Sequence, residues 1–306
     1  MTSASAEQSV SIAIIGSGLI GPRHAQSILR NPQATLHSLT DPAPHAIQIA
    51  TSLSATYYSS LSSLLSSSPL PATFLICTPN HTHVPIAISC IEAGIKYVLV
   101  EKPVSTSIQE GAKFLSVAKE HDATILVGHH RLFNPYLISA KIGLDYGVLS
   151  QITGVQGKIT TVSAIESKKT RGFDAEEGGA IILRFESGAV GTFLLSDAVP
   201  SPWNFEAGTG EILRFLRWSY EVGLGEEAWN DELEKDEIEV DTEIVLFDEQ
   251  IKHLVQVVME GKKPTCSGEE GLSAMVVYEA VRVAMKSGEM VEIEGLDILK
   301  RSSKHN

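Results

Sequence analysis

Short apolar runs alternate with amphipathic stretches through the first 128 residues of the chain. The runs are mostly continuous, which is typical of parallel strands that are buried on both faces. Strands that alternate with helices predict an α/β domain with a doubly wound parallel sheet over residues 11–128. The runs that we interpret as strands are Ile12–Ile15, Ala34–Thr40, Ala72–Thr78, Tyr97–Val100 and Ala123–Val127.

The amphipathic segments between these runs predict the helices of the first domain. One helical pattern begins near His24, and another stops at Gly94, a residue type that commonly ends helices. The serine-rich stretch Thr51–Ser68 is consistent with a weakly helical surface segment that buries Leu61, Leu64 and Leu65. The other predicted helices are His45–Leu53, His83–Ala93 and Ser107–His121.

The pattern changes after residue 128 and predicts an α+β domain with an open, mainly antiparallel sheet. Two apolar runs flank Glu186–Gly188, which is a hairpin signal. The acidic stretch Glu221–Glu243 is interpreted as a solvated loop or sheet rim. Ser267 and Glu270 form a capping box that opens the last helix. The elements expected here are a linking helix Pro135–Tyr146, strands Gln151–Ala164, Ala180–Phe185 and Val190–Leu195, strand-like pieces in Glu206–Val222, and helices Phe247–Met259 and Ser267–Lys286.

Length and composition indicate two domains with short tails. A chain of 306 residues, 43% of them hydrophobic, is long enough for a sizeable core. We expect a first domain over residues 11–128, a second domain for substrate binding and oligomerisation over residues 129–300, and disordered tails at 1–10 and 301–306. The net charge of −13 disfavours binding to nucleic acid or to an acidic membrane surface.

The sequence also favours a cytoplasmic protein without a metal site. Its apolar stretches are shorter than the roughly 20 residues of a membrane-spanning helix, and Met1–Val10 lacks the features of a signal peptide. The three cysteines, Cys77, Cys90 and Cys266, have no metal-ligand spacing and cannot all pair. This cysteine usage fits a reducing compartment.

A glycine-rich motif, G-S-G-L-I-G, lies between the first strand and the first helix. The unpaired N–H groups and the dipole of a helix start form an anion site. Gly16 permits a tight turn, Gly18 leaves room for a pyrophosphate, and Gly21 lets the helix pack close to the strand. An ordinary turn is the alternative for so short a motif, but its context favours dinucleotide binding. The residues expected at the cofactor are Gly16, Gly18, Leu19, Ile20 and Gly21.

Asp41 supplies the second cofactor signal because it follows Gly21 by 20 residues and comes directly after the second strand. A carboxylate in this position binds the adenosine ribose hydroxyls and repels the 2′-phosphate of NADP. Pro42 and Pro44 provide no nearby cation, which leaves His45 as the compensating group. We therefore expect NAD as the cofactor, with NADP as the alternative.

Polar residues also follow the other strands, where ligands bind in open α/β sheets. Lys102 is the strongest catalytic candidate because an amine with a pKa lowered by burial can exchange a proton with a substrate. The alternative for Lys102 is an ion pair with Glu101 or a solvated strand end. His83 either holds a ribose or begins a helix, and His129 and His130 either bind substrate or fill a domain junction.

The motifs G-S-G-L-I-G, T-P-N-H-T-H, E-K-P and G-H-H-R-L-F-N-P resemble those of the glucose–fructose oxidoreductase / inositol dehydrogenase (Gfo/Idh/MocA) family. The resemblance implies an N-terminal Rossmann domain, an α+β domain, and NAD(P)-dependent oxidation or reduction of a hydroxyl or carbonyl on a sugar, polyol or similar small metabolite. It makes Lys102 the general acid/base and implies a homodimer or homotetramer that associates through the second-domain sheet. It places Thr78, Asn80, His83, Glu101 and Lys102 near the cofactor, and His129, His130, Arg131, Asn134 and Tyr136 near the substrate.

The chain departs from this family between Gln151 and Glu177. Family members carry a helix with an Asp-x-x-x-His pair, whose histidine completes proton transfer with the lysine, and this stretch has no such pair. Proton transfer then depends on Lys102 alone, or on Lys102 with His129, His130 or Tyr136. Two alternatives to a dehydrogenase follow: a non-redox isomerase, cyclase or lyase of a specialised pathway, and a cofactor-sensing regulatory protein.

Overall fold

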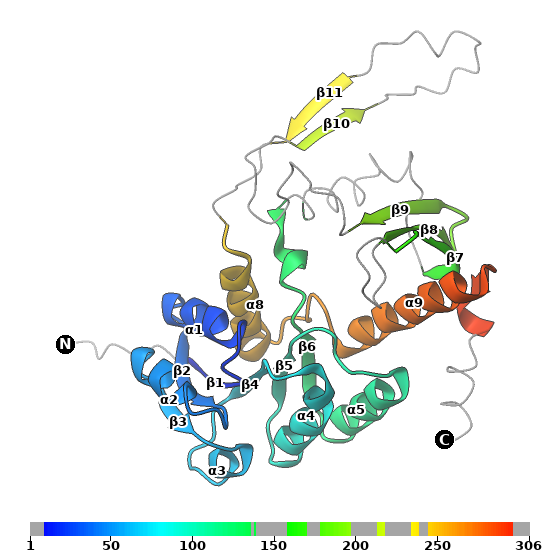
Figure 1. The fold of residues 1–306 in the computed structure, drawn as a ribbon. Helices are drawn as coiled ribbons and strands as arrows, with labels where there is room; N and C mark the ends of the chain where they lie inside the picture. Colours follow the sequence, from blue (N-terminus) through cyan, green and yellow to red (C-terminus); the bar gives the residue numbers. More distant parts are fainter. Residues whose placement is uncertain are drawn as a thin grey trace, which may run out of the picture. The chain divides into compact units, whose positions relative to one another are not determined.

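The computed structural model describes residues 9–135, 138, 158–169, 178–196, 213–217, 234–238 and 244–295 (Figure 1). Contacts divide the chain into two compact units, which we describe one at a time. The first unit contains residues 1–132, 245–279 and 294–306, and the second contains residues 133–244 and 280–293. Residues 245–279 therefore belong with the N-terminal part of the chain, although the sequence pattern alone groups them with the second half.

The first unit is built on a parallel sheet with strand order β3-β2-β1-β4-β5-β6. The chain reverses its direction of travel across the sheet between β1 and β4, which creates the crevice where doubly wound folds bind ligands. The predicted doubly wound parallel sheet is confirmed. Its strands are β1 (Val10–Ile15), β2 (Ala34–Thr40), β3 (Thr56–Tyr58), β4 (Thr73–Ile76), β5 (Tyr97–Val100) and β6 (Thr124–Val127).

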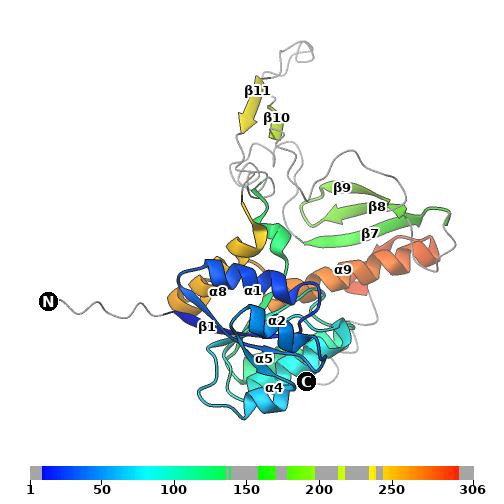
Figure 2. The same ribbon diagram turned by 60° about the vertical axis from the view of Figure 1, so that its left-hand side comes forward.

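Two apolar clusters pack against the two faces of this sheet. Alternate residues of β1 enter different clusters, with Ile12 and Ile14 in one and Ala13 and Ile15 in the other. The Ile12 cluster contains residues of α1 and α8, and the Ala13 cluster contains residues of α4 and α5 (Figure 1, Figure 2). The helices of this unit are α1 (Gly21–Arg30), α2 (Ala46–Ser52), α3 (Leu61–Leu65), α4 (His83–Glu92), α5 (Ile108–Glu120) and α8 (Leu246–Glu260), with 3₁₀ turns η1 (Asn80–Thr82) and η2 (His130–Phe133).

Two features of the first unit differ from the expectation. The serine-rich stretch is not wholly helical, because Thr56–Tyr58 forms the edge strand β3 before the short helix α3. Helix α8, expected in the second domain, packs through Ile251, Leu254 and Val255 into the same apolar cluster as β1. A bidentate ion pair between Arg30 and Asp248 also joins α1 to α8.

The second unit contains an antiparallel sheet with strand order β12-β7-β8-β9. The predicted hairpin is confirmed, because β8 (Gly178–Phe185) and β9 (Val190–Ser196) flank a turn in which Gly188 has φ +87°. The other strands of this sheet are β7 (Ile159–Glu166) and β12 (Val291–Glu292). Helix α9 (Gly268–Ser287) begins in the first unit and ends in the second, and η4 (Ile293–Gly295) follows β12.

The remaining predictions for the second half have mixed outcomes. The capping box is confirmed, because Ser267 N donates to Glu270 Oε2 at 2.7 Å and Glu270 N donates to Ser267 Oγ at 3.3 Å. Part of the acidic stretch lies in a sheet, one of its two expected alternatives, because β11 (Glu234–Ile238) pairs antiparallel with β10 (Leu213–Arg217). Most of the predicted helix Pro135–Tyr146, the start of Gln151–Ala164, residues 1–8 and residues 301–306 lie outside the described residues. Val10, the last residue of the predicted N-terminal tail, is instead the first residue of β1. In the described part of the chain, no helix combines the length and apolarity needed to cross a membrane.

Candidate functional site

The loop between β1 and α1 places the three glycines where the motif requires them. Gly16 has φ +103°, and a Cβ atom there would lie 2.6 Å from the carbonyl oxygen of Cys77. A Cβ atom on Gly21 would lie 2.1 Å from the carbonyl oxygen of Gly16. A Cβ atom on Gly18, by contrast, would meet nothing within 4 Å. Two glycines are therefore required by packing, and the third opens a space in front of the helix start that suits a phosphate group.

The two residues between Gly18 and Gly21 lie at the outer side of this loop. The side chain of Leu19 is 76% exposed, and Ile20 is the half-buried residue that precedes α1. The backbone of Leu19 and Ile20, and not their side chains, therefore lies at the start of α1.

Asp41 lies beside the glycine loop and is bonded to it. Its Oδ2 accepts hydrogen bonds from the N–H of Ser17 at 2.7 Å and from Ser17 Oγ at 2.8 Å, and its Oδ1 accepts one from Ala43 N at 2.8 Å. Burial alone raises the pKa of this carboxyl, but the hydrogen bonds from Ser17 and Ala43 outweigh it and lower the pKa below its ordinary value. Asp41 is therefore a carboxylate at neutral pH, and Oδ1 keeps the larger capacity to accept a further hydroxyl.

A cavity of about 650 Å³ opens beyond the carboxyl ends of β1, β2 and β4. Gly16, Gly18 and Asp41 line it on one side, and Thr78, Pro79 and Thr82 line it on the other. The residues present fit the adenosine and pyrophosphate half of a dinucleotide, because a carboxylate, an open glycine and a helix start face one space.

A second cavity, of about 840 Å³, begins at the next strand end and contains the strongest catalytic candidate. Lys102, Asn80 and His129 line it, opposite the residues Gly271, Met275 and Tyr278 of α9. The segment from Thr78 to Thr82 borders both cavities, because Thr78 lines the first and Asn80 lines the second. The two cavities therefore follow one another along the carboxyl edge of the sheet, as the two halves of a dinucleotide would.

Of the two alternatives for Lys102, the ion pair with Glu101 is not formed, whereas the solvated strand end agrees with the structure better than the buried amine that was expected. Its side chain is exposed and forms no ion pair with any of the residues described. His129 shares its cavity, and burial is the main reason why the pKa of this imidazole lies below its ordinary value; nearby Glu101 opposes the shift and Lys102 adds to it. At neutral pH, His129 is therefore a neutral imidazole that can accept a proton next to Lys102.

Two residues predicted to touch the cofactor occupy other positions. His83 is buried, with its Nδ1 2.9 Å from the Pro103 carbonyl oxygen and its Nε2 2.8 Å from the Thr78 carbonyl oxygen, so both ring nitrogens are already engaged. Glu101 is also buried, and its Oε1 lies 2.8 Å from Nε2 of His24. His83 thus joins the segments that follow β4 and β5, whereas Glu101 joins the end of β5 to α1, and neither residue lines either cavity.

His24 was missed by the sequence reasoning. The one signal for it is a histidine on the buried side of an amphipathic helix, a pattern that occurs in many cores without any function. Only the structure shows that a carboxylate from 77 residues further along the chain meets it.

The predicted substrate residues after β6 lie in η2 and its flanks. His130 stacks on Phe247, with ring centroids 4.4 Å apart, and burial lowers its pKa despite the opposing effect of Glu101. Arg131 is exposed and Asn134 is buried. Tyr136 lies outside the described residues.

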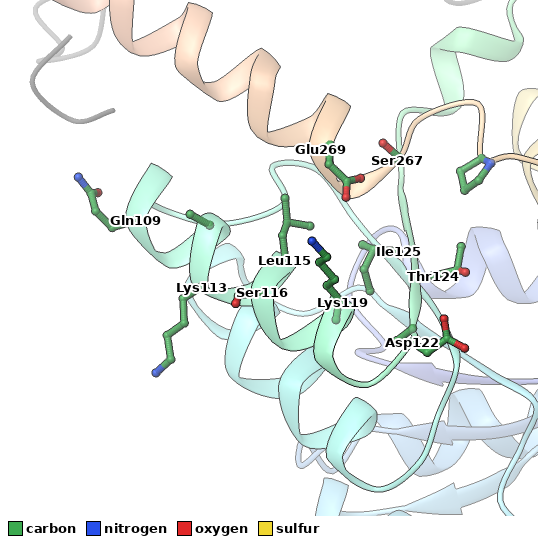
Figure 3. A pocket seen from close by; sticks show the side chains of 14 residues that line it. Gln109, Lys113, Leu115, Ser116, Lys119, Asp122, Thr124, Ile125, Ser267 and Glu269 are labelled. Carbon is green, nitrogen blue, oxygen red and sulfur yellow. The ribbon is translucent and has the colours of Figure 1, made fainter. Parts of the chain in front are cut away.

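A larger hollow, of about 1000 Å³, lies away from this chemistry (Figure 3). It is formed by α5, the start of β6 and the first turn of α9, and its lining includes Leu115, Lys119, Ile125 and Glu269. Because Thr124 begins β6, this hollow lies toward the amino end of that strand, opposite to the edge where α/β folds bind ligands. The part of the chain that the structure covers contains no group of three His, Cys, Asp or Glu side chains that could hold a metal ion.

The fold and the glycine loop define a dinucleotide-binding α/β domain, and comparison with known proteins agrees. Residues 10–129 match the family model described as "Oxidoreductase family, NAD-binding Rossmann fold", known as Gfo/Idh/MocA. The match covers the parallel-sheet domain, and over these residues the chain is similar to the Gfo/Idh/MocA oxidoreductases.

Individual proteins are similar to this chain to different extents. The chain is 33% identical to an uncharacterized oxidoreductase, YrbE, of Bacillus subtilis over 44% of this chain, and 25% identical to an inositol 2-dehydrogenase of Rhizobium meliloti over 47% of it. These matches span 39% and 43% of the two relatives' own lengths. The crystal structure of an oxidoreductase from Agrobacterium radiobacter in complex with NAD+, L-tartaric acid and magnesium has a TM-score of 0.80 at 12% identity, covering 94% of this chain and 99% of that one. This last likeness shows that the fold is shared.

Proposed function

We propose that the protein is an NAD-dependent dehydrogenase or reductase that acts on a hydroxyl or carbonyl group of a sugar, polyol or similar small metabolite. The observation that carries the proposal is the succession of two cavities along one sheet edge, the first with the glycine loop and Asp41 and the second with Lys102 and His129. The inositol 2-dehydrogenase among the relatives supports a polyhydroxylated substrate.

In the proposed mechanism, the backbone of Gly16–Gly21 holds the pyrophosphate, Asp41 holds the adenosine ribose, and Thr78 and Asn80 lie along the rest of the dinucleotide. Bound NAD supplies a nicotinamide ring that accepts a hydride from the substrate carbon. Lys102 Nζ takes the hydroxyl proton during oxidation and returns it during reduction, which is general acid/base catalysis. His129, as a neutral imidazole beside Lys102, then accepts this proton from the lysine. It thereby takes the role of the histidine in the missing Asp-x-x-x-His pair. His130, Arg131, Asn134 and Tyr136 remain our proposed substrate residues.

A coupled assay tests the proposed function directly. Purified protein is incubated with NAD+ or NADP+ and each member of a panel of inositols, pentoses and hexoses, and the absorbance of the reduced nicotinamide is followed. A product at the oxidation level of a ketone or lactone, formed in step with NADH, supports the proposal. Cofactor binding without any absorbance change, together with an isomerised or cleaved product, would instead identify a non-redox enzyme.

Replacing Asp41 by serine is expected to weaken NADH binding by about tenfold or more, because a charge-assisted hydrogen bond to the ribose is lost. NADPH binding should improve relative to NADH because the carboxylate that repels the 2′-phosphate is gone. Titration followed by nicotinamide fluorescence measures both constants. Asp41→Asn is the matched control for shape, and an unchanged NADH affinity in both variants would contradict the ribose assignment.

We further propose that the protein is a homodimer or homotetramer that associates through the β7–β9 sheet. The ladder registers place Ile165, Ile182, Val190 and Leu194 on one face of this sheet, and all four are exposed, Leu194 by 88%. The opposite face buries Val162, Ala164, Ile181 and Leu183. Ser163, Thr192 and Arg184 lie among them on the same face. Four large apolar side chains exposed on one face of a small sheet are typical of an interaction surface, so a second copy of the chain is the proposed partner.

Replacing Leu194 by lysine is expected to dissociate this oligomer and to raise its dissociation constant by at least about 100-fold, because a charge would be buried in the proposed interface. Sedimentation velocity measures the species present. Ile47→Lys, on the exposed side of α2 in the first unit, introduces the same charge at an exposed isoleucine and should leave the oligomer intact. Equal sedimentation of wild type and Leu194→Lys would rule out this sheet face as the interface.

A further inference from the structure

A buried histidine–carboxylate pair lies beneath the proposed catalytic lysine. His24 of α1 is fully buried and Glu101, directly after β5, is 7% exposed. His24 Nε2 lies 2.8 Å from Glu101 Oε1. Because a carboxylate only accepts hydrogen bonds, Nε2 carries the proton and donates it, while Nδ1 has no hydrogen-bond partner. Such a buried polar pair is costly to form, so its placement invites a functional explanation.

The second oxygen of Glu101 reaches Lys102 itself. Glu101 Oε2 accepts a hydrogen bond from the backbone N–H of Lys102 at 3.3 Å. A Cβ atom on Gly128 would lie 2.6 Å from Glu101 Oε1, so only glycine at the end of β6 leaves room for the carboxylate. Glu101 is therefore held between the ends of β5 and β6, with one oxygen toward α1 and the other toward the lysine backbone.

His24 connects this carboxylate to the glycine loop. It lies in the first turn of α1, three residues after Gly21, and α1 begins directly at the glycine motif. Phe247 of α8 fixes the imidazole from another side, with ring centroids 4.9 Å apart and planes at 86°. The bond from His24 to Glu101 thus joins the helix start that receives the pyrophosphate to the residue that carries the catalytic amine.

The charge of Glu101 also acts on the groups around Lys102. Glu101 is surrounded by Cys77 directly after β4, His24 of α1, Lys102, and the histidines His129 and His130 after β6. Glu101 raises the pKa of His129 and of His130, against burial, which lowers both, and against the nearby cations Lys102 and Arg131. The carboxylate is the one anion that the structure describes among these groups.

We propose that His24 and Glu101 are positioning residues that hold Lys102 at the cofactor: Glu101 anchors the lysine backbone, and His24 ties Glu101 to the glycine-loop helix. This inference rests on the proposed function insofar as Lys102 acts on a substrate beside the nicotinamide. Neither side chain faces the cavities, so neither is a catalytic residue.

The test compares wild type with His24→Leu, His24→Gln and Glu101→Gln. Leucine removes the donor, whereas glutamine at position 24 keeps an N–H that can reach Glu101. Ser27→Ala, at a buried position three residues further along α1, is the matched control. Acetylation of Lys102 is measured by mass spectrometry with and without NADH, using Lys113 and Lys119 of α5 as internal standards, and NADH affinity is measured by fluorescence.

We expect NADH to protect Lys102 in wild type and in Ser27→Ala. His24→Leu and Glu101→Gln should bind NADH within about threefold of wild type but lose at least about fivefold of this protection, because a lysine displaced by about 1 Å no longer meets the cofactor. His24→Gln should restore it. A pair with a merely structural role would lower the melting temperature of the variants without changing the ratio of Lys102 to Lys113 labelling, and that result would overturn the proposal.

The outcome separates this inference from the proposed function. If NADH does not protect Lys102 in wild type, the placement of the lysine at the cofactor is wrong, and the pair is judged by the labelling ratio without NADH. A ratio altered in His24→Leu and restored in His24→Gln then supports positioning, and an unaltered ratio excludes it. Proton NMR of Glu101→Gln provides an independent check, because the titration midpoints of His129 and His130 should fall by at least about half a pH unit when the carboxylate is neutralised.

Discussion

Replacing Lys102 by alanine is expected to abolish turnover while leaving NADH binding intact. The amine lines the second cavity, whereas the glycine loop and Asp41 line the first, so the substitution leaves the proposed contacts with the adenosine and pyrophosphate half of the dinucleotide in place. General acid/base catalysis contributes about 10²- to 10⁴-fold, and a fall in kcat of about this size is expected. The measurement is the steady-state rate of nicotinamide reduction with the best substrate of the panel, paired with an NADH titration.

Two further variants and a rescue experiment sharpen this result. Lys102→Arg keeps the positive charge but cannot release a proton near neutral pH, so it should be as inactive as Lys102→Ala. Small primary amines added to Lys102→Ala should restore part of the rate, because they supply the missing proton acceptor. Lys113→Ala, on α5 beside the hollow of Figure 3, removes a lysine outside the site and should be fully active. A kcat of Lys102→Ala within about tenfold of the wild-type value would assign the proton transfer to another group, with His129 the first to test.

The fold was predictable wherever local pattern and tertiary structure agree. The continuous apolar runs gave β1, β2, β4, β5 and β6 because strands buried on both faces need no polar alternation. The hairpin β8–β9 and the capping box at Ser267 are encoded by a few residues at fixed spacing. Strand β3 was not predicted because it is short and lies at the sheet edge, where Thr56–Tyr58 has no continuous apolar pattern.

The sequence predicted the candidate site only where the side chain that follows a strand points outward and lines a cavity. Asp41, Lys102 and Asn80 line cavities as their positions after strands suggested. Glu101 and His83 also follow strands, yet their side chains turn inward to His24 and to two backbone carbonyls. Nothing in the local sequence distinguishes the two orientations, since partners 20 and 77 residues away decide them. Likewise, the contact of α8 with β1 depends on the packing of distant segments and has no local signal.

The three glycines of the loop allow a prediction that separates cofactor binding from folding. Gly18→Val is expected to leave the melting temperature unchanged, because no atom lies within 4 Å of the added Cβ position. It should nevertheless weaken NADH binding by at least about tenfold, which is about 1.4 kcal/mol, because the side chain occupies the space proposed for the pyrophosphate.

Gly21→Ala, by contrast, is expected to lower the free energy of unfolding and, as a consequence, to weaken NADH binding. Its Cβ would lie 2.1 Å from the carbonyl oxygen of Gly16, so α1 must move away from β1. Overpacking of this kind costs about 1–3 kcal/mol of folding free energy. Because the start of α1 is displaced, the affinity for NADH should also fall. Thermal melts and fluorescence titrations of the two variants, made side by side, measure both effects. If Gly18→Val binds NADH as tightly as wild type, the loop is an ordinary turn and the dinucleotide must lie elsewhere; if it fails only in binding, the open space in front of α1 is the pyrophosphate site.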